Sequence, residues 1–167
     1  MSSTSVSSPK QDLFVHGPLS STEDSFRLCR ILLDDLSENN HGSLATAVSS
    51  EPAIRLVVEH FEIPAHVDAN DDIEQGQEKS AGTTPEYTAL SYTWGAELPQ
   101  FDILINNRLF AIRQNLMDFL LEMRRQGEAA WFWIDQICIN QSDTSERNHQ
   151  VSQMARIYSG TRWVYAW

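Results

Sequence analysis

The run from Trp131 to Tyr158 constrains this chain more than any other stretch of its sequence. Residues from Trp131 to Ile139 form a nearly continuous apolar segment, rich in aromatic and β-branched side chains, which is typical of a strand covered on both faces. The polar residues from Asn140 to Asp143 predict a turn, and a helix follows it. Residues from Arg162 to Trp167 predict the next strand. A strand, a helix and a strand in this order predict a βαβ unit with two parallel strands.

The helix in this unit has a start signal and an apolar stripe. Asp143 is followed three residues later by Glu146, which is the spacing of a capping box with Asp in place of Ser or Thr. Arg147 lies four residues before the stripe and continues the same face. Ser159 and Gly160 end the helix. The stripe that we expect to be buried consists of Val151, Met154, Ile157 and Tyr158.

Two blocks of residues resemble the fungal heterokaryon-incompatibility (HET) domain family. One block is WIDQICINQ, which begins at Trp133, followed by Asp143, Glu146-Arg147, Gln150-Val151, Met154 and Ile157-Tyr158. The other is YTALSYTWG, from Tyr87 to Gly95, which is similar to the family's opening signature YxALSYxWG. Gln136 departs from the family, which more often has Ala at this point. The resemblance covers about the second half of the chain, from roughly Tyr87 onward.

The resemblance implies a fold and a role. HET domains look like relatives of the TIR fold, a flavodoxin-like parallel sheet used in immune and cell-death signalling. We therefore expect an α/β fold: a small parallel sheet flanked by helices, with an inserted β-hairpin and an N-terminal β extension. The implied role is a cytoplasmic module of fungal non-self recognition and programmed cell death. Its implied partners are a second copy of itself or another HET- or NLR-type protein.

Alternatives to this role remain open. Some TIR domains cleave NAD with a glutamate on a helix beyond the third strand, so a TIR-like NAD-cleaving hydrolase is one alternative. Residues Arg162–Trp167 would be that third strand, which leaves the catalytic residues unknown and the expected segment beyond Trp167. No cofactor is assigned on this basis, and NAD or a related nucleotide is the candidate. The other alternative is a truncated fragment without activity of its own.

Composition excludes several other classes of protein. The chain of 167 residues has a formal net charge of −11, which argues against a basic nucleic-acid-binding surface. Its apolar runs are too short for a membrane-spanning helix, and no signal sequence opens the chain. No histidine or cysteine cluster has the spacing of a metal site, so we expect no metal. Both cysteines, Cys29 and Cys138, lie in apolar segments and are expected to be buried, reduced thiols.

The charge also helps to divide the chain. Residues 1–24 are rich in Ser and predict a disordered tail, and residues 25–61 predict an N-terminal β extension with strands at Phe26–Leu33 and Ala53–Phe61. Residues 62–86 carry seven acids against one lysine and predict a flexible acidic insertion. Residues 87–167 form the HET domain, which we expect to be incomplete at its C-terminal end.

Within that domain, a hairpin and a helix separate the two family blocks. Phe101–Arg113 alternates around Asn106-Asn107, a pair that tolerates the positive φ of a two-residue turn. Asn115 is the expected N-cap of a helix over 116–126, which Gly127 closes. Its expected buried stripe consists of Leu116, Phe119, Leu120 and Met123.

The candidate site follows from placing the two family blocks side by side. Parallel strands at Tyr87–Trp94 and Trp131–Ile139 would bring Gly95 close to the turn at Asn140–Asp143, on the edge where open sheets bind ligands. The helix N-terminus there favours an anion such as phosphate, unless its own capping carboxylates occupy the N–H groups. We predict, as ligand- or partner-binding residues, Tyr92, Trp94, Gly95, Asn140, Gln141, Asp143, Glu146 and Gln150.

Asp135 needs a partner, because an ionised carboxylate inside an apolar strand is costly to bury. Arg147 is the predicted partner, in a structural ion pair that locks the helix against the strand. The alternative is a functional pair that positions a ribose hydroxyl or a phosphate. Glu146 and Gln150 lie one turn apart on the side of the helix that we expect to be more exposed.

Overall fold

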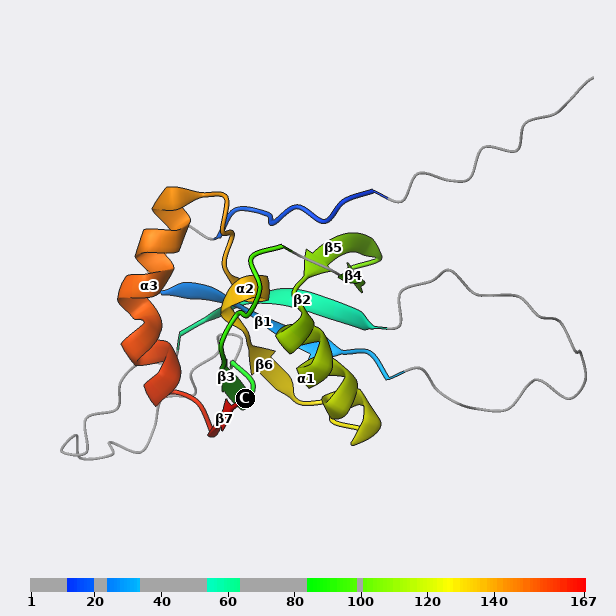
Figure 1. The fold of residues 1–167 in the computed structure, drawn as a ribbon. Coiled ribbons are helices and arrows are strands. Elements are labelled where there is room, and N and C mark those ends of the chain that lie inside the picture. Colours follow the sequence, from blue (N-terminus) through cyan, green and yellow to red (C-terminus); the bar gives the residue numbers. More distant parts are fainter. Residues whose placement is uncertain (1–11, 20–23, 34–53, 64–83, 99–100) are drawn as a thin grey trace, which may run out of the picture.

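The fold is an α/β arrangement around one mixed sheet (Figure 1). The structure is a computed structural model that describes residues 12–19, 24–33, 54–63, 84–98 and 101–167. Most of the predicted acidic insertion therefore lies outside the described residues. The strands are β1 (Ser25–Ile31), β2 (Arg55–Glu62), β3 (Tyr87–Ser91), β4 (Phe101–Ile105), β5 (Arg108–Ile112), β6 (Trp131–Trp133) and β7 (Trp163–Ala166). The helices are α1 (Gln114–Arg125), α2 (Asp135–Cys138) and α3 (Thr144–Ser159).

The strands described here form one sheet in the order β5-β4-β2-β1-β6-β3-β7. Strand β1 pairs antiparallel with both β2 and β6, whereas β3 pairs parallel with β6 and with β7. The expected α/β class is confirmed, but the sheet is mixed rather than parallel. The segment predicted as an N-terminal extension lies in the middle of this sheet. Its strands β2 and β1 stand between the hairpin β4–β5 and the parallel strands β6, β3 and β7.

The two tryptophan-bearing segments are parallel neighbours. Tyr87 pairs with Trp131 and Ala89 with Trp133 across the β3–β6 ladder. On the other side of β3, Thr88 pairs with Trp163 in β7, which is also parallel. The predicted βαβ unit is thus present, although β3 lies between its two strands. The carboxyl ends of β3 and β6 point to one common edge of the sheet.

Helices α1 and α3 lie on opposite sides of these parallel strands (Figure 1). Successive side chains of a strand point to opposite faces, and β6 shows this clearly. The Phe132 ring packs edge-on against Phe119 of α1, with 5.7 Å between ring centroids. The neighbouring Trp133 ring packs against Tyr158 of α3 at 5.4 Å. Both faces of β6 are therefore covered, and Phe132 and Trp133 are almost fully buried.

The hairpin and α1 follow the sequence prediction, with one correction. Asn106 and Asn107 both have positive φ, 49° and 63°, at the β4–β5 turn, and the four predicted stripe residues of α1 are buried. The predicted N-cap at Asn115 is wrong, because Arg113 occupies that position without a side-chain cap hydrogen bond. Asn115 instead donates to the Thr93 carbonyl at 2.9 Å, which ties α1 to the end of β3.

The strand predicted over Trp131–Ile139 is only three residues long. It stops at Trp133, and the chain turns into the short helix α2 at Asp135. The Cys138 N–H donates to the Ile134 carbonyl at 2.7 Å, which closes the helical turn. The Asp135 carboxylate accepts from the Gln136 N–H at 2.7 Å, so this side chain favours a helix start over a continued strand.

Helix α3 starts where predicted, but it presents a different face to the core. Val151 is 53% exposed and Arg147 is also exposed. Gln150, expected on the exposed side, is completely buried together with Ile157. The stripe is rotated because Gln150 donates through Nε2 to the Ser25 carbonyl at 2.8 Å, a contact that compensates for burying an amide.

Part of the predicted N-terminal tail is ordered. Leu13 forms a parallel bridge with Leu109, and the Phe14 N–H donates to the Leu109 carbonyl at 2.8 Å. The segment 12–19 then passes from β5 toward the start of α3 (Figure 1). His16 donates through Nε2 to the Ile137 carbonyl at 2.7 Å. The Ser-rich composition does not predict these contacts, because their partners Leu109 and Ile137 lie more than ninety positions away in the sequence.

Candidate functional site

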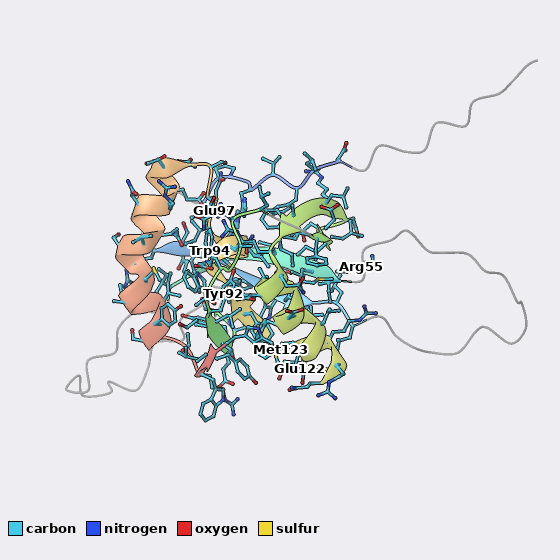
Figure 2. All side chains as sticks on the ribbon, in the orientation of Figure 1. Arg55, Tyr92, Trp94, Glu97, Glu122 and Met123 are labelled. Carbon is cyan, nitrogen blue, oxygen red and sulfur yellow. The ribbon has the colours of Figure 1, made fainter. Side chains whose placement is uncertain are left out.

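The candidate site lies at the common edge where β3 and β6 end. Tyr92 and Trp94 follow β3 and lie between α1 and α3 (Figure 2). The Trp94 indole N–H donates to Asp135 Oδ2 at 2.9 Å, and the Tyr92 hydroxyl donates to Gln136 Oε1 at 3.1 Å. The two family blocks are thus joined through side chains as well as through the strand ladder. This set (Tyr92, Trp94, Asp135 and Gln136) is called the rim network below.

The rim network changes the ionisation of its acidic members. Burial raises the pKa of Asp135, while hydrogen bonds from Trp94 and from the Gln136 N–H oppose that rise. Burial also raises the pKa of Tyr92, and the nearby Asp135 carboxylate raises it further. Tyr92 therefore stays a neutral hydrogen-bond donor at physiological pH. A buried carboxylate with a raised pKa is a feature of functional sites and also of structural networks.

A cation–π contact holds the Trp94 loop against the start of α1, and a glycine shapes the loop. The Arg113 guanidinium lies over the Trp94 ring, 4.9 Å from its centroid, in a cation–π contact. Gly95 has a φ of +73°, a conformation that glycine adopts without strain. A Cβ at Gly95 would lie 3.5 Å from the Asn115 side chain, an ordinary contact, so the backbone angle is what selects glycine. Sequence reasoning missed Arg113, which carries no local signal.

The turn after α2 is built by its own polar side chains. Gln141 donates through Nε2 to the Asp135 carbonyl at 2.9 Å, and Asn140 Oδ1 accepts from the Ser142 hydroxyl at 2.7 Å. Asp143 Oδ1 accepts from the N–H groups of Ser145 and Glu146, at 2.9 and 3.1 Å. The predicted N-cap of α3 is confirmed. These capping bonds occupy the N–H groups that an anionic ligand would need.

The expected Asp135–Arg147 ion pair is not formed. Asp135 bonds to Trp94 on the rim, while Arg147 lies exposed one turn into α3. The neighbouring Glu146 is the residue that forms the buried ion pair, and its partner is Arg27 of β1, with side chains 11% and 1% exposed respectively. An ion pair does connect α3 to the sheet, but it joins Glu146 to Arg27 instead of Arg147 to Asp135.

Arg27 has hydrogen-bond acceptors on every side. Its Nη1 and Nη2 donate to the two carboxylate oxygens of Glu146 at 2.6 and 2.9 Å, a bidentate contact. Nη1 also donates to the Cys138 carbonyl at 3.0 Å, and Nη2 donates to the Gly17 carbonyl at 2.6 Å. Nε donates to His60 Nε2 at 3.1 Å. Arg27 thus connects the N-terminal segment, β2, α2 and α3, and we call these contacts the arginine hub.

The arginine hub also sets the ionisation of its neighbours. Burial opposes the ionisation of Glu146, but hydrogen bonds from Arg27 and the Asn140 N–H outweigh it, and the pKa of Glu146 is lowered. The pKa values of His16 and His60 are lowered, chiefly by burial and further by the Arg27 charge. Sequence reasoning did not select Arg27. Arg27 is the second residue of the apolar run FRLCRILL, and a charged residue inside such a run was the signal that could have found it.

The remaining predicted residues are placed as follows. Gln150 lies away from the rim network, against β1, and its Oε1 has no hydrogen-bond partner among the described residues. Cys29 and Cys138 are buried and not joined by a disulfide, as predicted.

A cavity of about 640 Å³ lies beside the hub, lined by Phe14, Val15, Gly17, Arg27, Val58, Glu59, His60, Asn106 and Arg108. None of the predicted ligand-binding residues lines this cavity.

The described residues contain no group of three or more His, Cys, Asp or Glu side chains that could hold a metal ion. In the same part of the chain, no helix has the length and apolar character needed to cross a membrane.

Comparison with known proteins identifies the region that holds the rim network. Residues 87–167 match the model of the family described as Heterokaryon incompatibility protein (HET). This part of the chain is a HET domain. The match begins at the first residue of β3 and includes both segments that form the rim network. Strands β1 and β2 precede the matched region, yet they complete the sheet of the HET domain and supply Arg27 and His60 to the hub.

Two curated relatives agree with the family match. Heterokaryon incompatibility protein 6, OR allele, of Neurospora crassa is 38% identical over 96 residues, which cover 50% of this chain and 14% of that protein. Vegetative incompatibility protein HET-E-1 of Podospora anserina is 24% identical over 99 residues, which cover 58% of this chain and 7% of that protein. The chain thus spans only a small part of the length of these relatives. No solved structure matches the chain.

Proposed function

We propose that this chain is a heterokaryon-incompatibility protein, which acts in the cytoplasm as a signalling module of fungal non-self recognition and programmed cell death. The observation that carries the proposal is the HET match over residues 87–167, together with two relatives whose names denote incompatibility proteins. The rim network lies inside that match. Its side chains bond to one another, which supports a role in holding the signalling conformation.

The arrangement of the parallel strands supports a flavodoxin- or TIR-like core. Three strands of the HET domain pair parallel with one another: β3 comes first in the chain, β6 second and β7 third, and they lie in the order β6-β3-β7. This is the 2-1-3 order with which flavodoxin-like sheets begin. The other strands, β1, β2, β4 and β5, would be additions on the β6 side of that core.

A non-enzymatic module is favoured over an NAD-cleaving hydrolase. The rim network contains the carboxylate of Asp135, and the arginine hub contains that of Glu146. Each accepts hydrogen bonds from side chains of the protein, Asp135 from Trp94 and Glu146 from Arg27. The N–H groups at the start of α3 are occupied by Asp143. The module would signal by associating with a second copy of itself or with another HET- or NLR-type protein.

Inducible expression in Neurospora crassa tests the proposal. We expect the chain to arrest hyphal growth and kill cells, and we expect Trp94→Phe, which removes the N–H donated to Asp135, to weaken this effect. Val151→Lys on the exposed side of α3 is the control and should retain it. Normal growth of strains that accumulate the soluble wild-type chain would contradict the proposal. Purified chain incubated with NAD should release no nicotinamide, and release would favour the hydrolase.

A further inference from the structure

The short helix α2 connects the rim network to the arginine hub. Its first residue, Asp135, belongs to the rim network. At the other end of α2, the Ile137 carbonyl accepts a hydrogen bond from His16 at 2.7 Å. The adjacent Cys138 carbonyl accepts one from Arg27 at 3.0 Å. The last carbonyls of a helix have no partner inside the helix, so the N-terminal segment and β1 supply the partners that α2 lacks.

The N-terminal segment over residues 12–19 lies on the surface, and we call it the latch segment. Its backbone bonds to Leu109 of β5 near one end and, through the Gly17 carbonyl, to the arginine hub near the other. Two of its apolar side chains point outward, since Leu13 is 71% and Val15 70% exposed. A segment that buries little apolar surface opens at a lower free-energy cost than the core. The latch segment can therefore detach while the sheet stays folded.

The half-buried ring of His16 anchors the latch segment. It lies edge-on to the rings of Phe14 and Phe110, at 4.9 and 6.0 Å between centroids. Because Nε2 donates to the Ile137 carbonyl, Nε2 carries the proton of the neutral ring and Nδ1 carries none. A second proton, on Nδ1, would place a positive charge among these rings and close to the Arg27 guanidinium. The anchor is therefore suited to the neutral ring.

His60 of β2 is also held in its neutral form. Its Nε2 accepts from Arg27 Nε at 3.1 Å, so protonation of Nε2 would turn this acceptor into a donor that faces another donor. The charged groups that act on the two histidines are Arg27 of β1 and Glu146 of α3. Glu59 of β2 and Arg108 of β5 line the cavity beside them. Protonation of both rings would add two positive charges to a hub in which one arginine already neutralises one carboxylate.

We propose that the latch segment is released by acid: protonation of His16 and His60 frees it from the arginine hub, and α2 and the rim network then loosen. Release leaves the Ile137 carbonyl without its donor, two residues from the Asp135 carboxylate of the rim. Burial lowers the pKa of both histidines from 6.5, so acidification below that pH favours the released state. The link to signalling rests on the proposed function, whereas the release itself is independent of it.

Hydrogen exchange of the full chain, measured by NMR at about pH 7.5 and about pH 5.5, tests the release. The reporter is the Phe14 N–H, which donates to the Leu109 carbonyl. After correction for the intrinsic rate at each pH, we expect it to exchange several-fold faster at the lower pH. The Leu104 N–H, which donates to the Ile54 carbonyl inside the sheet, is the internal control and should stay protected at both values.

A double variant identifies the groups that titrate. Glutamine keeps a hydrogen-bonding amide but does not titrate, so His16→Gln with His60→Gln should abolish the extra exchange at the lower pH. Val15→Ala changes an exposed side chain of the same segment and should leave the pH dependence as in the wild type. Protection at Leu104 shows that each variant is folded. Unchanged protection of Phe14 at the lower pH, or the same pH dependence in the double variant, would overturn the release.

The indole N–H signal of Trp94 tests the link to the rim network. Because this N–H donates to Asp135, we expect its chemical shift to change with acidification in the wild type and to stay constant in the double variant. A change that persists in the double variant would mean that Asp135 itself titrates, and it would refute the link. Failure of the chain to arrest hyphal growth, together with intact acid release, would refute the proposed function and leave the latch standing.

Discussion

The buried ion pair between Arg27 and Glu146 makes the sharpest stability prediction. Glu146→Gln keeps the shape of the side chain but removes the negative charge beside a guanidinium that is 1% exposed. Arg27 then keeps only neutral acceptors, the carbonyls of Gly17 and Cys138 and the ring nitrogen of His60. Removing one member of a buried pair typically costs about 3–5 kcal/mol.

We expect the lower end of that range for Glu146→Gln. The Glu146 side chain is 11% exposed, and the new amide can still accept a hydrogen bond from Arg27 or from the Asn140 N–H. A loss of about 3 kcal/mol in the free energy of unfolding corresponds to a fall in Tm of about 6–12 °C for a domain of this size. Urea unfolding followed by tryptophan fluorescence measures the first quantity, and a thermal melt measures the second.

Glu122→Gln is the matched control. Glu122 makes the same kind of contact with Arg125, but on the exposed surface of α1, where an ion pair contributes little. The double variant Arg27→Met with Glu146→Gln should be more stable than the sum of the two single losses predicts, because the unpaired charge is gone. Equal losses in Glu146→Gln and Glu122→Gln, or additive losses in the double variant, would refute the buried pair.

The same pair gives a pH dependence with a definite sign. Because the folded-state pKa of Glu146 is lowered from 4.5, the carboxylate stabilises the fold above that pH. This contribution is lost as the pH falls through the folded-state pKa. Wild-type stability should therefore decline more steeply than that of Glu146→Gln below about pH 4.5. Parallel stability–pH curves for the two proteins would contradict the assignment.

Three further perturbations follow from local geometry. The fold lowers the pKa of His60 from 6.5, because burial favours the neutral ring. Acidification below pH 6.5 therefore lowers the free energy of unfolding of the wild type. In His60→Gln, the free energy of unfolding measured with urea should depend less on pH in this range. Asn106→Gly keeps the positive φ but removes two hydrogen bonds to the Val58 backbone, at 3.1 and 3.2 Å, and should cost about 1–3 kcal/mol by chemical denaturation, so an unchanged midpoint would discount them. Gly95→Ala and Gly127→Ala should each lower the free energy of unfolding by about 1 kcal/mol, because their φ angles are +73° and +71°. A much larger fall in Tm for Gly95→Ala would mean that the added Cβ disturbs the Asn115 side chain more than it strains the backbone.

The sequence by itself determined several local elements and the family. Positive-φ tolerance at Asn106-Asn107, the Asp143 cap and the apolar stripe of α1 each depend on residues close together in the sequence, so local chemistry was sufficient. The parallel pairing of β3 with β6 was also predictable, because two β-then-helix segments in sequence favour a right-handed parallel unit. The rim network lies at the edge where these strands end: Tyr92 and Trp94 were among the predicted binding residues, whereas Asp135 was predicted to pair with Arg147 and Gln136 was not selected.

The tertiary structure alone decided which charges are paired and which faces are buried. Arg27 and Glu146 are 119 residues apart, and nothing in the spacing of α3 distinguishes Glu146 from Arg147 as the inward-facing residue. The rotation of α3 that buries Gln150 and exposes Val151 depends on the Ser25 carbonyl of β1. A buried polar group is stable only beside its partner, and that partner is supplied by packing between distant segments.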